Sequence, residues 1–269
     1  MVEALLWSTL ACVIFALAVR LLLPRVLAWR GVWFCWHTRF GPALVFDSED
    51  EDGTTVRLLN VNGTYQSVCY VDDDLLWVPV CEYHRTWGRE VRRRFGPVSE
   101  APEQRRALVM GGGGYSFPKW LVAYRPDFSC EVVEIDPAIK RIARERFFVD
   151  RLLEEFDCEA TGRLVLEVAD AWDYLLADED GYDLIVNDAF GGNKPLGRLS
   201  GKEGARTIRA HLRKGGLYIG NVRTPLEGKR AKALDETVRA FETEFAHVRV
   251  IPERPEEPRA KGNNTLLAW

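Results

Sequence analysis

The chain has 269 residues, of which 47% are hydrophobic and 28% charged, and this composition supports a folded core. The formal net charge of −4 gives no indication of a nucleic-acid-binding surface. The six cysteines form no CxxC pair and no metal-like spacing with the four histidines. We therefore expect reduced structural cysteines, no metal site, and one large domain or one domain with a small companion.

The N-terminal stretch is too apolar for an ordinary globular domain. Residues 4–19 carry no charge, and three leucines after Arg20 extend the run to Pro24, long enough to span a bilayer if Arg20 reaches the interface. Only Glu3 precedes the run and several arginines follow it, so the positive-inside rule predicts a single-pass anchor with a cytoplasmic soluble part. The alternatives are a buried or interfacial helix, or the last span of a larger multi-span relative.

The next part of the chain predicts a small antiparallel β unit. Residues 25–43 are aromatic and basic, as expected of a stretch beside a membrane. In residues 43–72, Asp52-Gly53 and Asn62-Gly63 separate apolar runs, and such pairs predict hairpins. A helix is expected before a charged linker at 96–106.

From residue 107 onward, apolar strand-like runs alternate with helical patterns, which predicts a parallel sheet with helices on both faces. The predicted strands are 107–110, 130–135, 163–169, 182–188 and 216–222. The predicted helices are 117–124, 137–148, 171–176 and 202–213, followed by a last helix at 227–245 and two strands. The fold class is therefore α/β, with a doubly wound, mostly parallel seven-stranded sheet after the small β unit and the N-terminal transmembrane helix.

We divide the chain into three parts. Residues 1–30 form the anchor and juxtamembrane segment, residues 31–100 the small β domain with its helix, and residues 101–269 a nucleoside-binding Rossmann-like catalytic domain.

A run of four glycines, in "VMGGGGYSFPKW", connects the first predicted strand of the large sheet to a helix. No Gly-Lys-Ser/Thr follows, and Pro118 stands where a dinucleotide fingerprint has its third glycine, so neither phosphate-binding loop fits. This pattern favours a nucleoside ligand without a pyrophosphate, such as S-adenosylmethionine or a derivative. We expect its arm to approach the backbone of the glycines closely, which makes cofactor contacts of Gly111, Gly112, Gly113 and Gly114.

Acidic residues end the strands that follow the glycines. Glu134 lies 21 residues after Gly113, near the ~20 typical of a carboxylate that binds ribose hydroxyls. Asp170 follows the next strand, where it would accept from an adenine amino group or cap the following helix. Asp188 follows the strand after that, at the centre of the edge where ligands of such sheets bind. We expect Asp136 to be a helix N-cap.

These motifs together resemble the polyamine aminopropyltransferase (spermidine synthase) family. The resemblance covers about residues 55–225 and is carried by "VMGGGGYSFPKWL", "VVEIDPAIKRIARERF", "VADAWDYL", "YDLIVNDAFGG" and "LLNVNGTYQSVCYVDDDLLWVPVCEYHRTW". It implies a class I methyltransferase-like fold preceded by a small β domain. The N-terminal span in front of it is similar to the membrane-fused branch of that family.

The resemblance also implies roles for individual residues. Asp188 would be the catalytic carboxylate, and Tyr83 would complete the hydrogen bonds of the amine. The other implied positions are cofactor contacts at Gln66, Glu134, Ile135, Asp170 and Ala171, and acceptor contacts at His84 and Phe190. The co-substrate would be decarboxylated S-adenosylmethionine and the partner a small-molecule amine, with a homodimer as a further option.

The chemistry requires an amine nitrogen to attack the methylene next to a sulfonium. Because amines are mostly protonated near neutral pH, a carboxylate such as Asp188 must accept a proton or orient the nitrogen. The glycine-rich stretch at 190–201 is predicted to be a lid that excludes water.

Two positions depart from the family pattern. Gly114 and Gly191 stand where the family has aspartates, of which the first helps to hold the aminopropyl arm. A diamine needs a carboxylate at each end, because an unpaired buried ammonium is costly. The alternatives that these departures favour are a methyltransferase that uses S-adenosylmethionine itself, and a catalytically inactive nucleoside-binding domain associated with the membrane.

Overall fold

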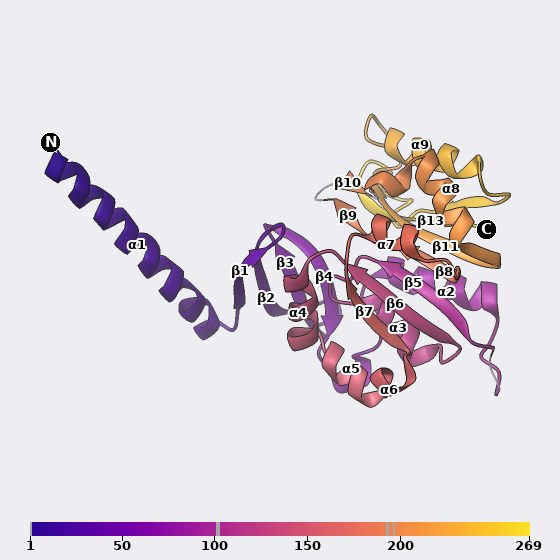
Figure 1. Ribbon diagram of the computed structural model, residues 1–269, viewed down its shortest axis with the longest axis horizontal. Helices are drawn as coiled ribbons and strands as arrows, with labels where there is room; N and C mark the ends of the chain where they lie inside the picture. Colours follow the sequence, from indigo (N-terminus) through magenta and orange to yellow (C-terminus); the bar gives the residue numbers. More distant parts are fainter. Residues whose placement is uncertain (1, 101–102, 192–193, 196) are drawn as a thin grey trace.

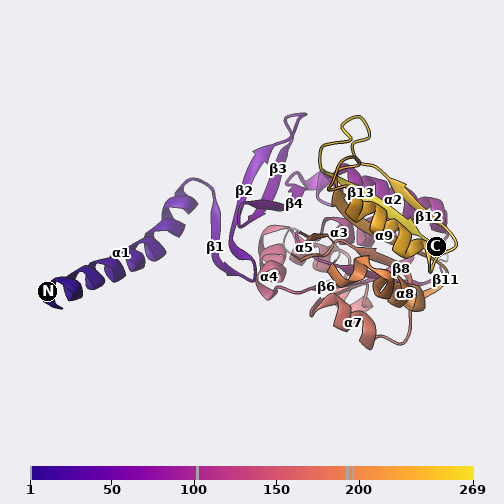
Figure 2. The ribbon, with the colours of Figure 1, turned by 90° about the horizontal axis from the view of Figure 1, so that it is seen from above.

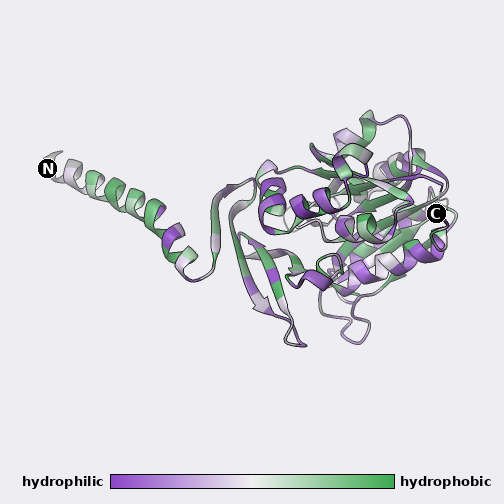
Figure 3. Ribbon diagram, turned by 90° about the horizontal axis from the view of Figure 1, so that it is seen from below, coloured by the Kyte–Doolittle hydropathy of each residue, from purple (hydrophilic) through white to green (hydrophobic). Residues whose placement is uncertain are grey.

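A long helix projects from the N-terminal end of the molecule. The computed structural model describes residues 2–100, 103–191, 194–195 and 197–269, and it begins with α1 (Val2–Trp29), which packs against β1 (Trp33–Thr38) (Figure 1). Residues Trp7–Trp29 are long and apolar enough to cross a membrane, and hydrophobic residues cover much of this helix in Figure 3. Signal sequences share these properties, so the single-pass topology stays a prediction.

The small sheet lies between α1 and the rest of the molecule (Figure 2). Its four antiparallel strands follow the chain order: β1, β2 (Gly41–Glu49), β3 (Thr55–Val61) and β4 (Thr64–Tyr70). Asn62 and Gly63 have φ of 49° and 78°, the left-handed pair that a tight two-residue hairpin requires. The predicted β unit is therefore confirmed.

The strand β1 was not anticipated, because its aromatic residues were interpreted only as a stretch beside a membrane. Trp33 and Cys35, two residues apart, both pack against the core under the small sheet. Residues two apart lie on the same face of a strand, so these two side chains share the face that packs on this core. This core includes Val45 and Leu59 of the sheet and Ile142 of α4 (Pro137–Arg146), so the small sheet is fastened to a helix of the large domain.

The second half of the chain forms a seven-stranded sheet of order β12-β13-β11-β8-β5-β6-β7. The strands are β5 (Arg105–Met110), β6 (Phe128–Glu134), β7 (Leu164–Val168), β8 (Tyr182–Asn187), β11 (Leu212–Thr224), β12 (Val248–Ile251) and β13 (Gly262–Ala268). The pairs among β7, β6, β5, β8 and β11 are parallel, and β13 runs antiparallel to both of its neighbours. This is the mostly parallel arrangement predicted, with its switch point between β5 and β8.

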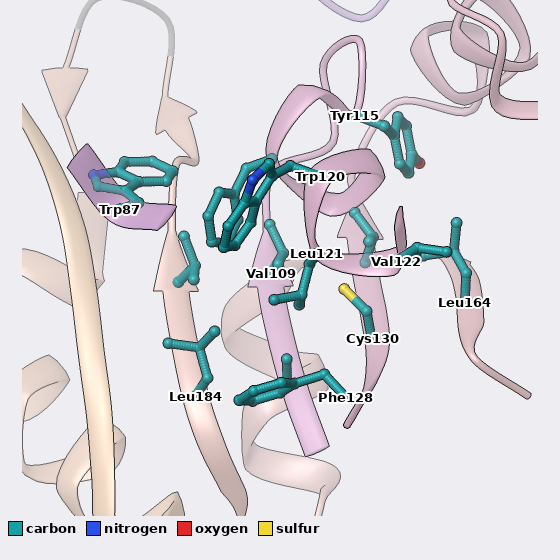
Figure 4. Close-up of a cluster of buried hydrophobic side chains, with 14 of the residues drawn as sticks. Trp87, Val109, Tyr115, Trp120, Leu121, Val122, Phe128, Cys130, Leu164 and Leu184 are labelled. Atoms are coloured by element: carbon teal, nitrogen blue, oxygen red, sulfur yellow. The ribbon is translucent and has the colours of Figure 1, made fainter. Parts of the chain in front are cut away.

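Helices cover both faces of the large sheet. One apolar cluster joins the sheet to α2 (Glu82–Phe95), α3 (Ser116–Tyr124) and α5 (Val149–Glu155), and Figure 4 shows Trp87 and Trp120 within it. The other cluster involves α7 (Ala171–Ala177), α8 (Lys202–His211) and α9 (Lys232–Glu242). The division at residue 100 stays a prediction, and α2, just before it, buries Trp87 and Val91 against the large sheet.

Several short elements escaped prediction. They are η1 (Asp73–Leu75), α5, α6 (Cys158–Thr161), β9 (Phe190–Gly191), β10 (Lys194–Pro195) and η2 (Gly197–Ser200). Each is too short to carry a clear helical or strand period, so tertiary packing rather than local pattern decides it.

Candidate active site

A cavity of about 600 Å³ opens at the carboxyl ends of the parallel strands. It lies at the switch point of the sheet, and residues from β4, the β1–β2 turn and α2 complete its wall. Most residues predicted for the site line it: Gln66, Tyr83, His84, Gly111, Gly112, Gly113, Glu134, Ile135, Asp170, Ala171, Asp188 and Phe190. Gly114 does not belong to this lining.

The glycine run is explained largely by contacts within the protein. A Cβ on Gly111, which has φ of 94°, would lie 2.7 Å from the carbonyl oxygen of Asp188. A Cβ on Gly112 would lie 2.7 Å from the ring of Tyr115, and one on Gly114 would lie 2.5 Å from Ser67 Oγ. Only at Gly113 is the nearest atom as far as 3.5 Å. Gly114 packs against Ser67 of the small sheet, and its contact with a cofactor stays a prediction.

Glu134 ends β6 and is buried beside the glycine turn. Its Oε2 accepts hydrogen bonds from the amides of Gly112 at 2.9 Å and Gly113 at 3.2 Å, and its Oε1 accepts one from Asp136 N at 2.9 Å. Burial raises the pKa of the Glu134 carboxyl, and these three amides oppose that shift without cancelling it. The carboxylate is thus held in a fixed orientation at the cavity wall.

Two further aspartates cap helices. Asp136 Oδ1 accepts from Ala138 N at 2.8 Å at the start of α4, as predicted, and its Oδ2 accepts from Arg39 N. Asp170 Oδ1 accepts from the amides of Trp172 at 2.9 Å and Asp173 at 3.4 Å at the start of α7. Asp170 therefore combines the capping role with a place in the cavity lining.

Asp188 lines the cavity and is held by side chains from α2 and β11. Asn221 Nδ2 donates to its Oδ1 at 2.8 Å, and the Tyr83 hydroxyl donates to its Oδ2 at 3.5 Å. His84 Nε2 lies 3.3 Å from the same Oδ2. The side chain stays 19% exposed, which leaves room for a ligand atom beside the carboxylate.

Of the two ring-bearing partners of Asp188, His84 is buried and Tyr83 is half-buried. Burial, followed by the negative charge of Asp188, raises the pKa of Tyr83 well above its ordinary value, so its hydroxyl remains a donor at neutral pH. His84 is 6% exposed, and its Nδ1 has no hydrogen-bond partner among the described residues. The ring packs against Tyr83, Trp87 and Phe117, which fixes its position.

The sequence analysis missed the contribution of β11 and β13. Asn221 is 1% exposed and lies in the otherwise apolar run "GLYIGNV", so a lone polar residue in a buried strand was the signal that could have found it. Asn263 in β13 accepts from Asn221 Nδ2 at 3.3 Å. Four cations, which no local motif marks, also line the cavity: Arg39, Arg198, Arg223 and Lys261.

The glycine-rich stretch predicted to be a lid begins with β9 and β10, which pair antiparallel across Gly191 and Lys194. Residues 192–193 and 196 of this stretch lie outside the described residues, so the lid stays a prediction. Arg198 and Leu199, which follow, line the cavity, and the Arg198 guanidinium lies 4.5 Å from the centroid of the Trp172 ring.

No protein-family model matches the chain. Individual sequences do: over 199 residues the chain is 26% identical to a polyamine aminopropyltransferase of Vibrio vulnificus, which covers 71% of this chain and 60% of that relative. Over 112 residues it is 30% identical to a polyamine aminopropyltransferase of Neisseria meningitidis serogroup A, covering 42% of this chain and 40% of that protein. The chain thus matches well under two thirds of the length of these relatives.

Solved structures show the same fold. A probable spermidine synthase from Corynebacterium glutamicum superposes with a TM-score of 0.69 at 21% identity, covering 88% of this chain and 79% of the other. Human methyltransferase-like protein 13, in complex with SAH, superposes with a TM-score of 0.54 at 20% identity, covering 70% of this chain and 82% of the other. The chain is therefore similar in sequence to polyamine aminopropyltransferases, which are transferases, and its fold is class I methyltransferase-like.

Proposed function

We propose that the chain transfers an aminopropyl group from decarboxylated S-adenosylmethionine to a small-molecule amine. The observation that carries this proposal is the Asp188 carboxylate, held by Asn221 and Tyr83 in a cavity that Glu134 also lines. The name of the curated relatives points to polyamine-type acceptors.

The nucleoside would occupy the end of the cavity formed by the glycine turn and the strand ends beside it. Glu134 would accept from the ribose hydroxyls, with Ile135 beside it, and Asp170 and Ala171 would contact the adenine. Gln66, on β4, faces Gly113 across the cavity wall, where the arm of the co-substrate would pass. This end supplies orientation, because its donors and acceptors are held by backbone amides.

At the acceptor end, the amine nitrogen would attack the methylene carbon bound to the sulfonium. A carbon–nitrogen bond forms, the carbon–sulfur bond breaks with its electron pair moving to sulfur, and neutral methylthioadenosine leaves. The proton of the amine passes to Asp188, which acts as the general base. Tyr83 and Asn221 hold the carboxylate in place, and His84 and Phe190 bound the space for the acceptor.

The cofactor is tested by calorimetry on the full chain with decarboxylated S-adenosylmethionine, S-adenosylmethionine and methylthioadenosine. We expect binding of the first and the last, and mass spectrometry should detect an aminopropylated amine when acceptors are added. Tight binding of S-adenosylmethionine with none of the decarboxylated form would contradict the proposal. Binding of nucleosides without any product would favour the inactive nucleoside-binding alternative.

The second candidate is a methyltransferase that uses S-adenosylmethionine, and Gly114 favours it. A side chain at this position would collide with Ser67 Oγ and with Phe147 Cδ1, at 2.5 Å and 2.7 Å from a Cβ. The chain therefore has no room there for the aspartate that holds the aminopropyl arm in the family it resembles. S-adenosylmethionine brings its own carboxylate and does not need that aspartate.

The proposal includes attachment to the cell membrane through the Trp7–Trp29 segment, with the cavity in the cytoplasm. The topology is tested with a reporter fused to the C-terminus. A reporter accessible only after the cytoplasmic membrane is permeabilised would support it, and an exported reporter would contradict it. The homodimer stays a prediction.

A further inference from the structure

Two cations stand at the acceptor end of the cavity, next to the group that orients Asp188. Arg223 follows Asn221 by two residues on β11, so both side chains leave the same face of the sheet. Two residues of a strand span about 7 Å, which places Arg223 one step outward from Asn221. Arg223 is paired in register with Asn263, and Lys261 immediately precedes β13, so both cations border the same opening.

These cations lack carboxylate partners. Of the four cations that line the cavity, only Arg198 forms an ion pair among the described residues, with Glu203 at 3.9 Å. Arg223 and Lys261 are both exposed and line the cavity, and no carboxylate of the described residues lies within ion-pair distance of either cation.

The carboxylates of the cavity are unequally distributed. Glu134 and Asp170 lie at the nucleoside end and already accept hydrogen bonds from backbone amides. Asp188 alone serves the acceptor end among the described lining residues. Glu253 lies nearby and its negative charge acts on Tyr83, but both its oxygens accept from Asn263, and it lines a neighbouring depression rather than the cavity.

The charge pattern therefore disfavours a diamine. One nitrogen would react beside Asp188, but the distal ammonium would approach Arg223 and Lys261 and be repelled by them. A carboxylate at the distal end would instead receive charge-assisted hydrogen bonds, which a guanidinium donates in pairs.

We propose that the acceptor is an amine that carries a carboxylate at its far end, held by Arg223 and Lys261 while its nitrogen lies beside Asp188. This inference rests on the proposed function for the identity of the reacting group. A diamine site would need a second carboxylate, and the cavity has two cations instead. An acceptor with its own carboxylate therefore fits an acceptor end where Asp188 is the one acidic lining residue among those described.

The test compares three amines of equal length by calorimetry on the full chain, with and without saturating methylthioadenosine: γ-aminobutyrate, putrescine and n-butylamine. Homologues of γ-aminobutyrate that are one methylene shorter and one methylene longer allow for a different distance between Asp188 and the two cations. We expect γ-aminobutyrate or one of these homologues to bind about tenfold more tightly than putrescine, as one charge-assisted pair contributes. Arg223→Gln and Lys261→Gln should each remove most of this preference and leave the affinity for n-butylamine unchanged.

Lys214→Gln is the matched control, because Lys214 is an exposed cation on the same strand and outside the cavity lining. Tighter binding of putrescine than of every amino carboxylate, or an unchanged preference in both Arg223→Gln and Lys261→Gln, would overturn the inference. Absence of methylthioadenosine binding would instead count against the proposed function. The comparison of amines in the absence of the nucleoside would still test the inference about the acceptor end.

Discussion

The two ends of the cavity are built in different ways. At the nucleoside end, Glu134 is held by the amides of Gly112, Gly113 and Asp136, which belong to two neighbouring strand–turn–helix units. At the acceptor end, Asp188 is held by side chains from α2 and β11, more than 30 residues away in either direction. The first end depends on local backbone geometry, whereas the second depends on the assembly of the whole sheet.

This difference predicts how each end responds to substitution. A backbone cradle tolerates change in most side chains, because amides do not vary with sequence. An assembled cluster of side chains changes its charge and shape with single substitutions, and Arg223 and Lys261 line the same cavity as Asp188. We therefore expect nucleoside binding to be the robust property of the molecule and acceptor choice to be the variable one.

The largest expected effect comes from a substitution that affects the acceptor end alone. Asp188→Asn should lower turnover by about 10² to 10⁴-fold, the usual contribution of a general base, and leave methylthioadenosine affinity nearly unchanged. Steady-state kinetics and calorimetry on the same preparation measure both. Asp173→Asn, which removes an exposed carboxylate outside the cavity lining, is the control and should change neither. Full turnover in Asp188→Asn would exclude the base role.

A substitution at the contact between Gly111 and Asp188 should lower both the stability of the fold and the affinity for the nucleoside. Gly111→Ala forces a side chain against the backbone of Asp188 at a φ of 94°, so we expect a loss of about 2 to 4 kcal/mol in the free energy of unfolding. Nucleoside affinity should fall as well. Gly162→Ala, with a φ of 66° and open space around it, should cost about 1 kcal/mol and leave affinity intact. Equal effects of the two variants in chemical denaturation would contradict this explanation.

A third site, away from the cavity lining, shows whether binding follows general stability. Burial opposes ionisation of Asp178, but hydrogen bonds from Arg106 at 2.9 Å and Tyr182 at 2.7 Å outweigh it and lower the pKa of the carboxyl to about 2. A lowered pKa stabilises the fold above the ordinary value near 3.8, and this contribution disappears as the pH falls toward 2.

Asp178→Asn should therefore reduce the free energy of unfolding at neutral pH by about 1 to 2 kcal/mol, and the deficit should vanish in acid. Denaturation curves from pH 7 down to the acid range measure it. Nucleoside affinity at pH 7 should not change; a parallel loss of affinity would mean that the cavity depends on the whole sheet more than its local hydrogen bonds indicate.

The smallest expected effect concerns the orientation of Asp188. Tyr83→Phe removes a hydroxyl that donates over 3.5 Å, so we expect turnover to fall about threefold to tenfold. Nucleoside affinity should stay constant, since Tyr83 lies at the acceptor end. A fall comparable to that of Asp188→Asn would assign Tyr83 a direct part in proton transfer.

Local patterns were sufficient to predict much of the fold. The hairpin at Asn62-Gly63, the cap at Asp136 and the alternation of strands and helices after residue 107 each depend on neighbouring residues, and each is found in the structure. The strand β1 was missed because its aromatic residues also fit a stretch beside a membrane, and only its pairing with β2 distinguishes the two. The close contact of Gly111 with Asp188 was missed because it joins residues 77 positions apart.

The sequence by itself determined the nucleotide-binding type of sheet, the glycine turn and the acidic strand ends, because strand, turn and helix signals act over a few residues. Only the tertiary structure decided that Asn221 orients Asp188, that Gly114 faces Ser67, and that Arg223 borders the acceptor end. These relations depend on the order and register of the strands, which bring distant side chains to one edge. No local pattern encodes such distances.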